Sequence, residues 1–293
     1  MKNRNKSLLL LYCLFLLGCN NDIFDCGKTE GFWMIIQNQT VFNSDIDFYD
    51  FSTHTVYLKK AQKFFADSDI GDFSVFVGNQ EIYKGIIYPI YFSTLPYGPF
   101  ISPSFSKENQ YSLSIGVMFF SDKNNKDPRN DPRIINSLKS QGKYHEGLQI
   151  KIIELKFLSD RQVVLDFQLS NNDSFDYLHL DPDKMGFGLF HYYTNGLGFY
   201  YNETYQRYEP ILSVIKLEPY DRWEKKWMSV IRSGESKRFK IKYDFSDPIP
   251  SGKFQAFFYF PGLSSYQVDI NDLNQKEGRI WLGGVEARVE YRK

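Results

Sequence analysis

The sequence predicts an all-β protein made of one or two antiparallel β-sandwich domains, with a short helix in the connecting segment. Short runs of alternating apolar and polar residues recur along the chain, and Gly, Pro, Asn and Asp separate them. Of the 293 residues, 42% are hydrophobic. A chain of this length and composition can bury the core of one large domain or of two ordinary ones.

The charge balance excludes some classes of partner. Lys and Arg number 35, and Asp and Glu also number 35. The chain therefore lacks the basic excess of a nucleic-acid-binding protein and the acidic excess of a disordered tail, and we expect no nucleic acid partner. Three cysteines are too few for a small fold held together by disulfides.

Five runs in the first half of the chain have the pattern of strands. They are residues 33–37, 55–60, 73–77, 81–84 and 111–120. Gly78 and Asn79 stand between two of these runs and tolerate the positive φ angles of a tight turn, so we expect a hairpin there. Four prolines lie within residues 88–105. Because proline cannot donate to a strand ladder, we expect an irregular edge or a long loop in this segment.

The segment 121–133 is polar, charged and interrupted by two Asp-Pro-Arg units. Asp131 has the side chain of a helix N-cap, Pro132 suits the first helical position, and Gly142 suits the helix end. The apolar stripe of this short helix would consist of Ile134, Ile135 and Leu138.

Three runs in the second half of the chain alternate more regularly. They are residues 162–169, 238–245 and 285–292. Such strands bury one face and expose the other, as the antiparallel sheets of a sandwich do. In residues 148–157 the phase of the alternation reverses at Ile152 and Ile153, which indicates a β-bulge.

Residues 233–260 contain a turn, a charged strand, a second turn and an apolar strand. This order resembles the late strands of extracellular immunoglobulin-like domains. The resemblance implies an immunoglobulin-like β-sandwich at residues 148–293, and it implies no activity. We expect a separate N-terminal β domain at residues 31–120 and a linker with the short helix at residues 121–147.

The N-terminus has the features of an export signal in their usual order. Three basic residues precede the ten apolar residues 8–17, which are too few to span a membrane permanently. Gly18 and Cys19 follow directly. This segment resembles the precursor of a bacterial lipoprotein, in which a small residue precedes the lipidated cysteine.

The lipoprotein resemblance implies that residues 1–18 are a cleaved signal peptide. It also implies that Cys19 carries a lipid such as palmitate, which would anchor the chain in a membrane through a tether of residues 19–30. The signal removes three basic and no acidic residues, which leaves 275 residues with a formal charge of −3. Cys26 would then have no cysteine partner in its own chain. Asn20 resembles the residue that follows the cysteine in lipoproteins sorted to the outer membrane, so we expect the cell envelope, and the outer rather than the inner membrane.

Known motifs identify no catalytic or cofactor site in the sequence. His145 and Glu146 begin like the zinc-protease motif, but Gln149 stands where the second histidine is required. Gly186 and Gly188 lack the third glycine of a dinucleotide-binding loop, and neither a Walker loop nor a Gly-x-Ser-x-Gly elbow occurs. We therefore expect no catalytic residues, no metal and no cofactor.

An acidic segment at residues 171–184 leaves one alternative open. It contains Asp173, Asp176, Asp181 and Asp183. Carboxylates are ligands that calcium prefers, but their spacing here differs from that of an EF-hand, so we interpret the segment as a solvated loop. His179 and His191 have no third ligand at a spacing that would indicate zinc.

Eight aromatic residues lie within residues 190–208, and a pair of tyrosines stands on each side of a glycine-rich turn. We expect a hairpin with one pair on each strand. Because neighbouring residues of a strand point to opposite faces, one face of the hairpin would offer its rings to a ligand. The candidate ligand-binding residues are Tyr192, Tyr193, Tyr200 and Tyr201. Packing of these rings inside the core is the alternative.

These observations favour a lipid-anchored cell-envelope protein that acts as a non-catalytic binding or assembly module. Its partner would be a glycan, a peptide or another envelope protein. Whether the chain is an enzyme stays open, although the sequence favours a protein without catalysis. The alternatives are a hydrolase of an envelope polymer, which needs converging Asp, Glu or His side chains in a pocket, and a protease inhibitor that presents a loop.

Overall fold

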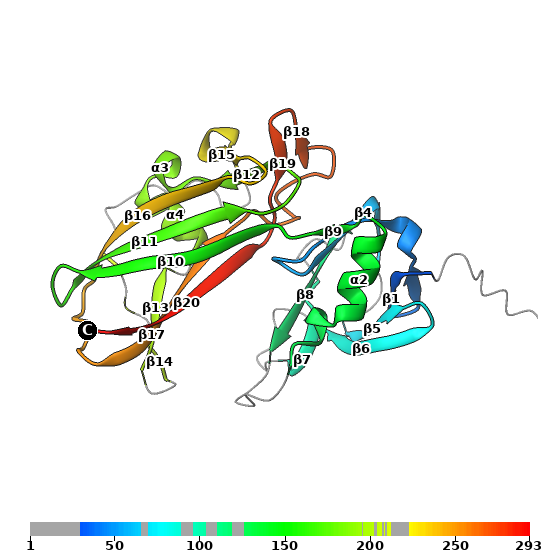
Figure 1. The fold of residues 1–293 in the computed structure, drawn as a ribbon, viewed down its shortest axis with the longest axis horizontal. Coiled ribbons are helices and arrows are strands. Elements are labelled where there is room, and N and C mark those ends of the chain that lie inside the picture. Colours follow the sequence, from blue (N-terminus) through cyan, green and yellow to red (C-terminus); the bar gives the residue numbers. More distant parts are fainter. Residues whose placement is uncertain are drawn as a thin grey trace, which may run out of the picture.

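The computed structural model describes residues 30–65, 70–88, 96–103, 110–118, 126–194, 196–201, 204–206, 208, 210–211 and 223–293. Strands predominate among them, and the helices are few and short, as the sequence predicts. The elements gather around two hydrophobic cores, and we call the part of the chain around each core the first and the second domain (Figure 1). The predicted signal peptide and Cys19 lie outside the described residues.

In the described residues, the first domain is one sheet of nine strands with a helix against it. The strand order is β2-β1-β5-β6-β7-β8-β4-β3-β9, and β6–β7 and β3–β9 are parallel pairs. The strands are β1 (Phe32–Ile36), β2 (Gln39–Val41), β3 (Ile46–Asp50), β4 (Thr55–Gln62), β5 (Gly71–Val77), β6 (Gln80–Ile87), β7 (Gly98–Ile101), β8 (Gln110–Met118) and β9 (Tyr144–His145). The helix is α2 (Pro132–Ser140), and the 3-10 turns are η1 (Asn43–Asp45) and η2 (Pro128–Asn130).

The strands of this sheet surround a single core. Met34 of β1, Val75 of β5 and Leu113 of β8 are buried in the same cluster as Ile134 and Leu138 of α2. The segment between the two predicted domains therefore contributes to the core of the first. β9 adds to this attachment because it pairs with β3.

Local signals place α2 where the sequence predicts it. The Asp131 carboxylate accepts a hydrogen bond of 2.9 Å from the backbone N–H of Arg133, and Pro132 takes the first helical position. Gly142, just beyond the helix end, has a φ of 65°. Gly78 similarly adopts a φ of 57° in the predicted turn between β5 and β6.

The proline-rich segment contains a short strand that the sequence analysis does not predict. β7 lies between β6 and β8 although it includes Pro99. Its pairing with β6 is limited to Phe100 and Ile101, so the missing N–H of Pro99 is not required on that side.

The second domain is a sandwich of two antiparallel sheets with a smaller sheet at one end. One sheet has β10 (Leu148–Phe157), β11 (Gln162–Asn171) and β16 (Ser236–Asp244). The facing sheet has β14 (Thr204–Gln206), β13 (Leu197–Tyr201), β17 (Lys253–Pro261) and β20 (Gly284–Arg292). The end sheet has β15 (Met228–Ile231), β12 (Tyr177–Leu180), β19 (Gly278–Ile280) and β18 (Asn274–Gln275). The helical pieces are α3 (Pro182–Met185), α4 (Phe187–Tyr193) and η3 (Lys225–Trp227).

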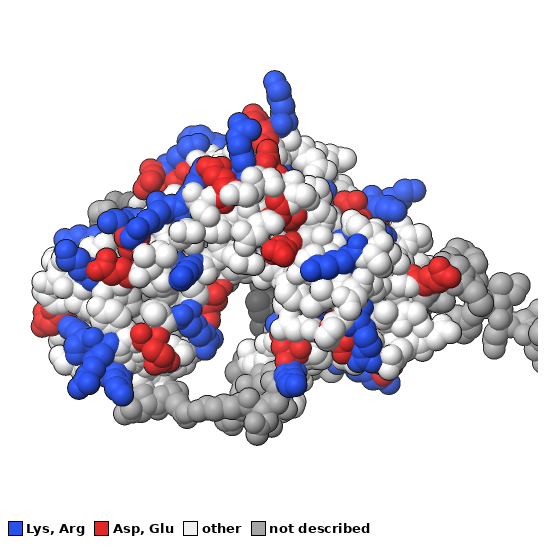
Figure 2. All heavy atoms as spheres, viewed as in Figure 1, with Lys and Arg blue, Asp and Glu red and all other residues white. Residues whose placement is uncertain are grey.

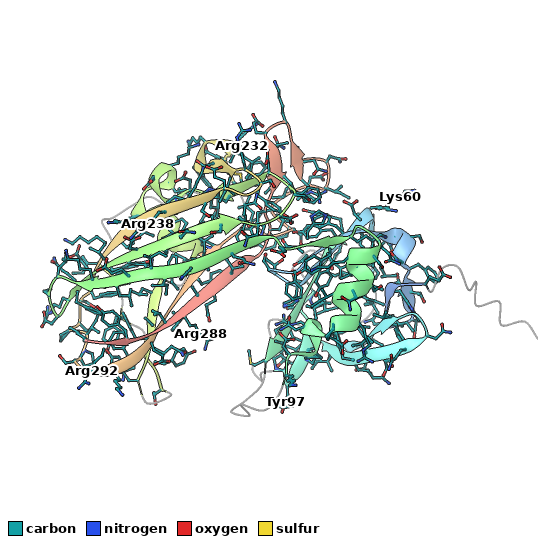
Figure 3. All side chains as sticks on the ribbon, viewed as in Figure 1. Lys60, Tyr97, Arg232, Arg238, Arg288 and Arg292 are labelled. Atoms are coloured by element: carbon teal, nitrogen blue, oxygen red, sulfur yellow. The ribbon has the colours of Figure 1, made fainter. Side chains whose placement is uncertain are left out.

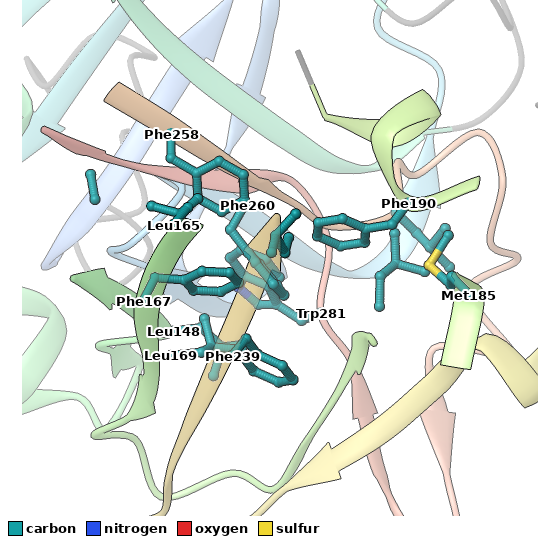
Figure 4. Close-up of a cluster of buried hydrophobic side chains, with 14 of the residues drawn as sticks. Leu148, Leu165, Phe167, Leu169, Met185, Phe190, Phe239, Phe258, Phe260 and Trp281 are labelled. Atoms are coloured by element: carbon teal, nitrogen blue, oxygen red, sulfur yellow. The ribbon is translucent and has the colours of Figure 1, made fainter. Parts of the chain in front are cut away.

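Aromatic side chains fill the space between the two sheets of the sandwich (Figure 4). The ring of Phe167 on β11 lies 5.3 Å from that of Phe239 on β16 and 4.9 Å from that of Phe258 on the facing sheet. Phe260 and Trp281 continue this contact toward the end sheet.

No helix in the described residues is long and apolar enough to cross a membrane.

The predicted alternation of β11 and β16 is confirmed. The two strands keep one register from the pair Gln162–Asp244 to the pair Ser170–Ser236. The β-bulge is confirmed as well, because the register of β10 against β11 shifts between Ile152 and Glu154. The shift leaves Ile153 exposed on the surface.

The predicted hairpin over residues 190–208 is wrong in its first strand. Residues Phe187–Tyr193 form α4, and the hairpin that does form joins β13 to β14. Phe187 and Phe190 are three residues apart, so a helix turns both toward the core, and Phe190 is completely buried. Gly186, with a φ of 75°, separates α4 from α3. The apolar residues thus have the spacing of a helix. The hairpin was predicted wrongly because it was inferred from the paired tyrosines and not from this spacing.

Candidate functional site

Two strands of the first domain are buried on both faces. On β4, Val56 and Leu58 belong to the first core, whereas Tyr57 between them belongs to the core of the second domain. Phe48 on β3 also packs into the second core, and its ring stacks on that of Tyr57 at 4.2 Å. Successive side chains of a strand point to opposite faces, so β3 and β4 carry the contact between the domains.

A cluster of stacked rings extends this contact. We call Phe48, His145, Phe175 and Arg279 the junction cluster. The His145 ring stacks on Phe175 with centroids 3.9 Å apart, and Phe48 meets both rings edge-on. The Arg279 guanidinium lies 4.1 Å from the centroid of Phe48 and 4.8 Å from that of Phe175, which is the geometry of a cation–π contact. It also forms an ion pair of 3.2 Å with Asp47.

The Asp173 carboxylate links the second domain to the end of the first domain through hydrogen bonds. It accepts hydrogen bonds from His145 Nδ1 at 2.6 Å, from the Tyr177 hydroxyl at 2.8 Å and from the backbone N–H of Gly147 at 3.1 Å. Burial raises the pKa of Asp173, but these hydrogen bonds outweigh burial and lower its pKa to about 2. The carboxylate is therefore ionised at neutral pH although it is 6% exposed.

A second buried carboxylate, that of Asp50, lies beside Gly147, where the chain passes from the first domain to the second. Asp50 Oδ1 accepts hydrogen bonds from the backbone N–H and the hydroxyl of Ser52 and from the backbone N–H of Thr53. Burial raises the pKa of Asp50 to about 6. Gly147 passes over this carboxylate with a φ of 68°, and a Cβ atom there would lie 2.3 Å from Asp50 Oδ1. Only glycine fits where the chain crosses between the domains.

A pocket of about 230 Å³ opens beside this contact, between the two domains. Six of its thirteen described lining residues are serine or threonine, and apolar side chains stand among them. The first domain contributes Thr55, Ile101, Ser102, Pro103, Gln110, Ser112, Leu113 and Ser114, and the second contributes Ser264, Ser265, Tyr266, Leu282 and Gly283. Seen as spheres, the domains touch in the upper part of the view, and an opening separates them below (Figure 2).

The described lining of the pocket contains hydroxyl and amide groups but no Asp, Glu, Lys, Arg or His. The hydroxyls of Thr55 and Ser114 hydrogen-bond to each other at 2.7 Å. Ser112 is 8% exposed, and its hydroxyl has no hydrogen-bond partner among the described residues. This hydroxyl can therefore donate to, or accept from, a molecule in the pocket. The described lining thus offers hydrogen-bond donors and acceptors to a molecule in the pocket.

The four tyrosines predicted to bind a ligand lie outside the lining of this pocket. Tyr192 is 42% exposed on α4, and Tyr193 packs edge-on against Trp227. Tyr200 and Tyr201 lie on β13, where Tyr201 donates a hydrogen bond of 3.0 Å to a backbone carbonyl. The structure therefore divides the four residues between a helix and a strand.

The acidic segment differs from the expected solvated loop. Asp173 and Asp181 are buried, and Asp181 accepts a hydrogen bond from the N–H of Asp183 at the start of α3. The His179 Nδ1 donates to the carbonyl of Leu180, and burial lowers the pKa of His179 to about 4. Within the described ranges, no three His, Cys, Asp or Glu side chains come together as a metal site.

Charged side chains on the second domain are mixed in sign (Figure 2), and Arg238 and Arg288 lie on two different strands of this domain (Figure 3). On the outer face of β11 and β16, Arg238 and Lys240 both reach Asp166, whose pKa the hydrogen bond from Arg238 lowers. Arg288 on β20 pairs with Glu286. Pairs of this kind at the surface contribute little to stability, and these strands present no field of a single sign.

Sequence reasoning missed the junction, although one signal was present. Residues Thr55 to Leu58 (Thr-Val-Tyr-Leu) form a run without a charged residue, which is the pattern of a strand covered on both faces, and all four are buried. The serines of β8 gave no signal, because Ser112 and Ser114 have the spacing of an ordinary solvent-facing strand.

Comparisons with protein-family models, curated proteins and solved structures found no match to this chain.

The substitution Asp50→Asn tests the buried carboxylate. The folded-state pKa of Asp50 is raised from 3.8 to about 6. The protonated carboxyl therefore stabilises the folded state fully below the unfolded-state pKa of 3.8, and this contribution is lost as the pH rises through 6. Asparagine keeps the Oδ1 acceptor without the charge. Relative to the native chain, the variant should gain about 2 kcal/mol of unfolding free energy between about pH 4 and pH 7.5.

Urea unfolding of both proteins at these two pH values measures that gain, and the difference between the proteins cancels the titration of all other groups. An equal stability difference at both pH values would contradict the raised pKa.

Proposed function

We propose that this chain is a lipid-anchored protein of the cell envelope, at the outer membrane, that acts as a non-catalytic binding module. The pocket between the domains is the binding site, and a membrane, through the lipid on Cys19, is its second partner. The observation that carries the proposal is the pocket itself, which both domains line with hydroxyl groups.

The packing at the junction supports a binding role. Tyr57 and Phe48 fix β3 and β4 against the second domain, so the two walls of the pocket are held in place without a ligand. A preformed site loses less conformational entropy when it binds. The lining supports binding rather than acid–base chemistry, because its described residues offer no carboxylate or imidazole to transfer a proton.

The N-terminal sequence supports the anchor. Its basic residues, apolar run, Gly18 and Cys19 follow the order of a bacterial lipoprotein precursor. Such a cysteine carries more than one acyl chain in that class of protein, and two chains hold a protein stably where one is marginal. The proposal includes an immunoglobulin-like architecture for the sandwich of the second domain.

The substitution Cys19→Ser tests the anchor. Serine lacks the thiol that accepts the lipid, so incorporation of a labelled palmitate analogue in cells should fall to background. Cys26→Ser is the matched control and should keep full labelling, because Cys26 lies beyond the expected acylation site. Equal labelling of the Cys19→Ser variant and the native chain would refute lipidation at this residue.

A variant that fills the pocket tests the binding site. Ser114 is an exposed residue that lines the pocket, so Ser114→Tyr should occupy the space without disturbing the core. In co-sedimentation with isolated envelope polymer, residues 20–293 should bind, and this variant should bind at least about tenfold more weakly.

Ser140→Tyr, on the exposed end of α2, is the matched control for an added tyrosine and should bind like the native chain. Equal binding by the Ser114→Tyr variant and the native chain, or the absence of binding by the native chain, would contradict the proposal.

A further inference from the structure

We infer that the pocket between the domains binds an uncharged saccharide unit. This inference rests on the proposed function and adds to it the chemical class of the ligand. It combines three properties of the described lining: serine hydroxyls without a partner in the described part of the chain, the lack of a charged side chain, and an exposed tyrosine ring.

The hydroxyls call for a ligand that both donates and accepts hydrogen bonds. Ser102, Ser112 and Ser265 line the pocket, and none of their hydroxyls bonds to a group in the described part of the chain. Each hydroxyl offers one donor and two acceptor sites. Ser112 is 8% exposed, and it lines the pocket. A sugar carries several hydroxyls in a compact space and matches this set of donors and acceptors.

The described lining should bind an ionic ligand less tightly than a neutral one. A carboxylate, phosphate or ammonium group would lose its hydration in the pocket, and no described lining residue offers an opposite charge. Hydroxyl groups lose less solvation, and the serines replace the hydrogen bonds to water that are lost. The pocket should therefore discriminate between a neutral sugar and a charged sugar of the same size.

Tyr266 provides a flat surface for the apolar face of a sugar ring. Its side chain is 46% exposed although it lines the pocket, so one part of the ring is available to a ligand. Tyrosine suits such a position because its ring is apolar and its hydroxyl is polar. The volume of about 230 Å³ is below the roughly 300–1,000 Å³ of sites that enclose drug-sized molecules, which favours a single sugar unit.

The test uses saturation-transfer NMR and titration of residues 20–293 with a small panel of probes. The probes are glucose, mannose and N-acetylglucosamine, then glucuronic acid and glucosamine as charged counterparts, and a capped Ala-Ala peptide. At least one neutral sugar should bind, and at least about tenfold more tightly than its charged counterpart.

Two variants test the residues that carry the inference. Ser112→Ala removes a hydroxyl without adding volume, and Tyr266→Ala removes the ring. Each should weaken the binding of the neutral sugar by about fivefold or more. Tyr97→Ala is the matched control, because Tyr97 is 58% exposed, does not line the pocket and should leave affinity unchanged. Thermal melts establish that each variant is folded.

Three results would overturn the inference: no neutral sugar binds the folded protein, charged sugars bind equally well, or only the peptide binds. If envelope polymer still binds and Ser114→Tyr still blocks it, the proposed function stands and only the ligand class is wrong. If the envelope polymer does not bind either, the proposed function itself has failed.

Discussion

The structure depends on the burial of β3 and β4 on both faces. Val56 and Leu58 anchor β4 in the first core, and Tyr57 between them enters the second core. A strand that serves two cores cannot shift by one residue, because the shift would exchange every side chain between them. The stack of Phe48 on Tyr57 and the cation–π contacts of Arg279 follow from this placement. So does the use of glycine at position 147, where the chain passes between Asp50 and Asp173.

The pocket arises because the face of the first sheet that meets the second domain carries both large rings and small side chains. Thr55 and Tyr57 point from β4 toward the second domain, and they pair across the strands with Ser114 and Ser112 of β8. Where the face carries large rings, the second domain packs directly against them. Where it carries small hydroxyl residues, a space remains beneath the segment that contains Tyr266. The Tyr111 hydroxyl, bonded to the carbonyl of Val268 at 2.7 Å, holds that segment in place.

The sequence predicted the elements better than their assembly. Alternation identified β11 and β16, the phase change at Ile152 identified the bulge, and Asp131 with Pro132 identified the start of α2, because each signal is local. The junction depends on contacts such as that of His145 with Asp173, which the chain brings together over 28 residues. Local pattern cannot show which polar strand face meets solvent and which meets a second domain. The helix α4 was missed because a cluster of tyrosines carried more weight than the spacing of Phe187 and Phe190.

Calorimetric unfolding of residues 20–293 tests the central claim that the two domains are one cooperative unit. Because β3 and β4 belong to both cores, loss of either core exposes the other. The protein should therefore unfold in one transition at neutral pH, with a van't Hoff enthalpy equal to the calorimetric enthalpy. Two resolved transitions, or a van't Hoff enthalpy near half of the calorimetric value, would show that the domains unfold independently and that the pocket has no rigid frame.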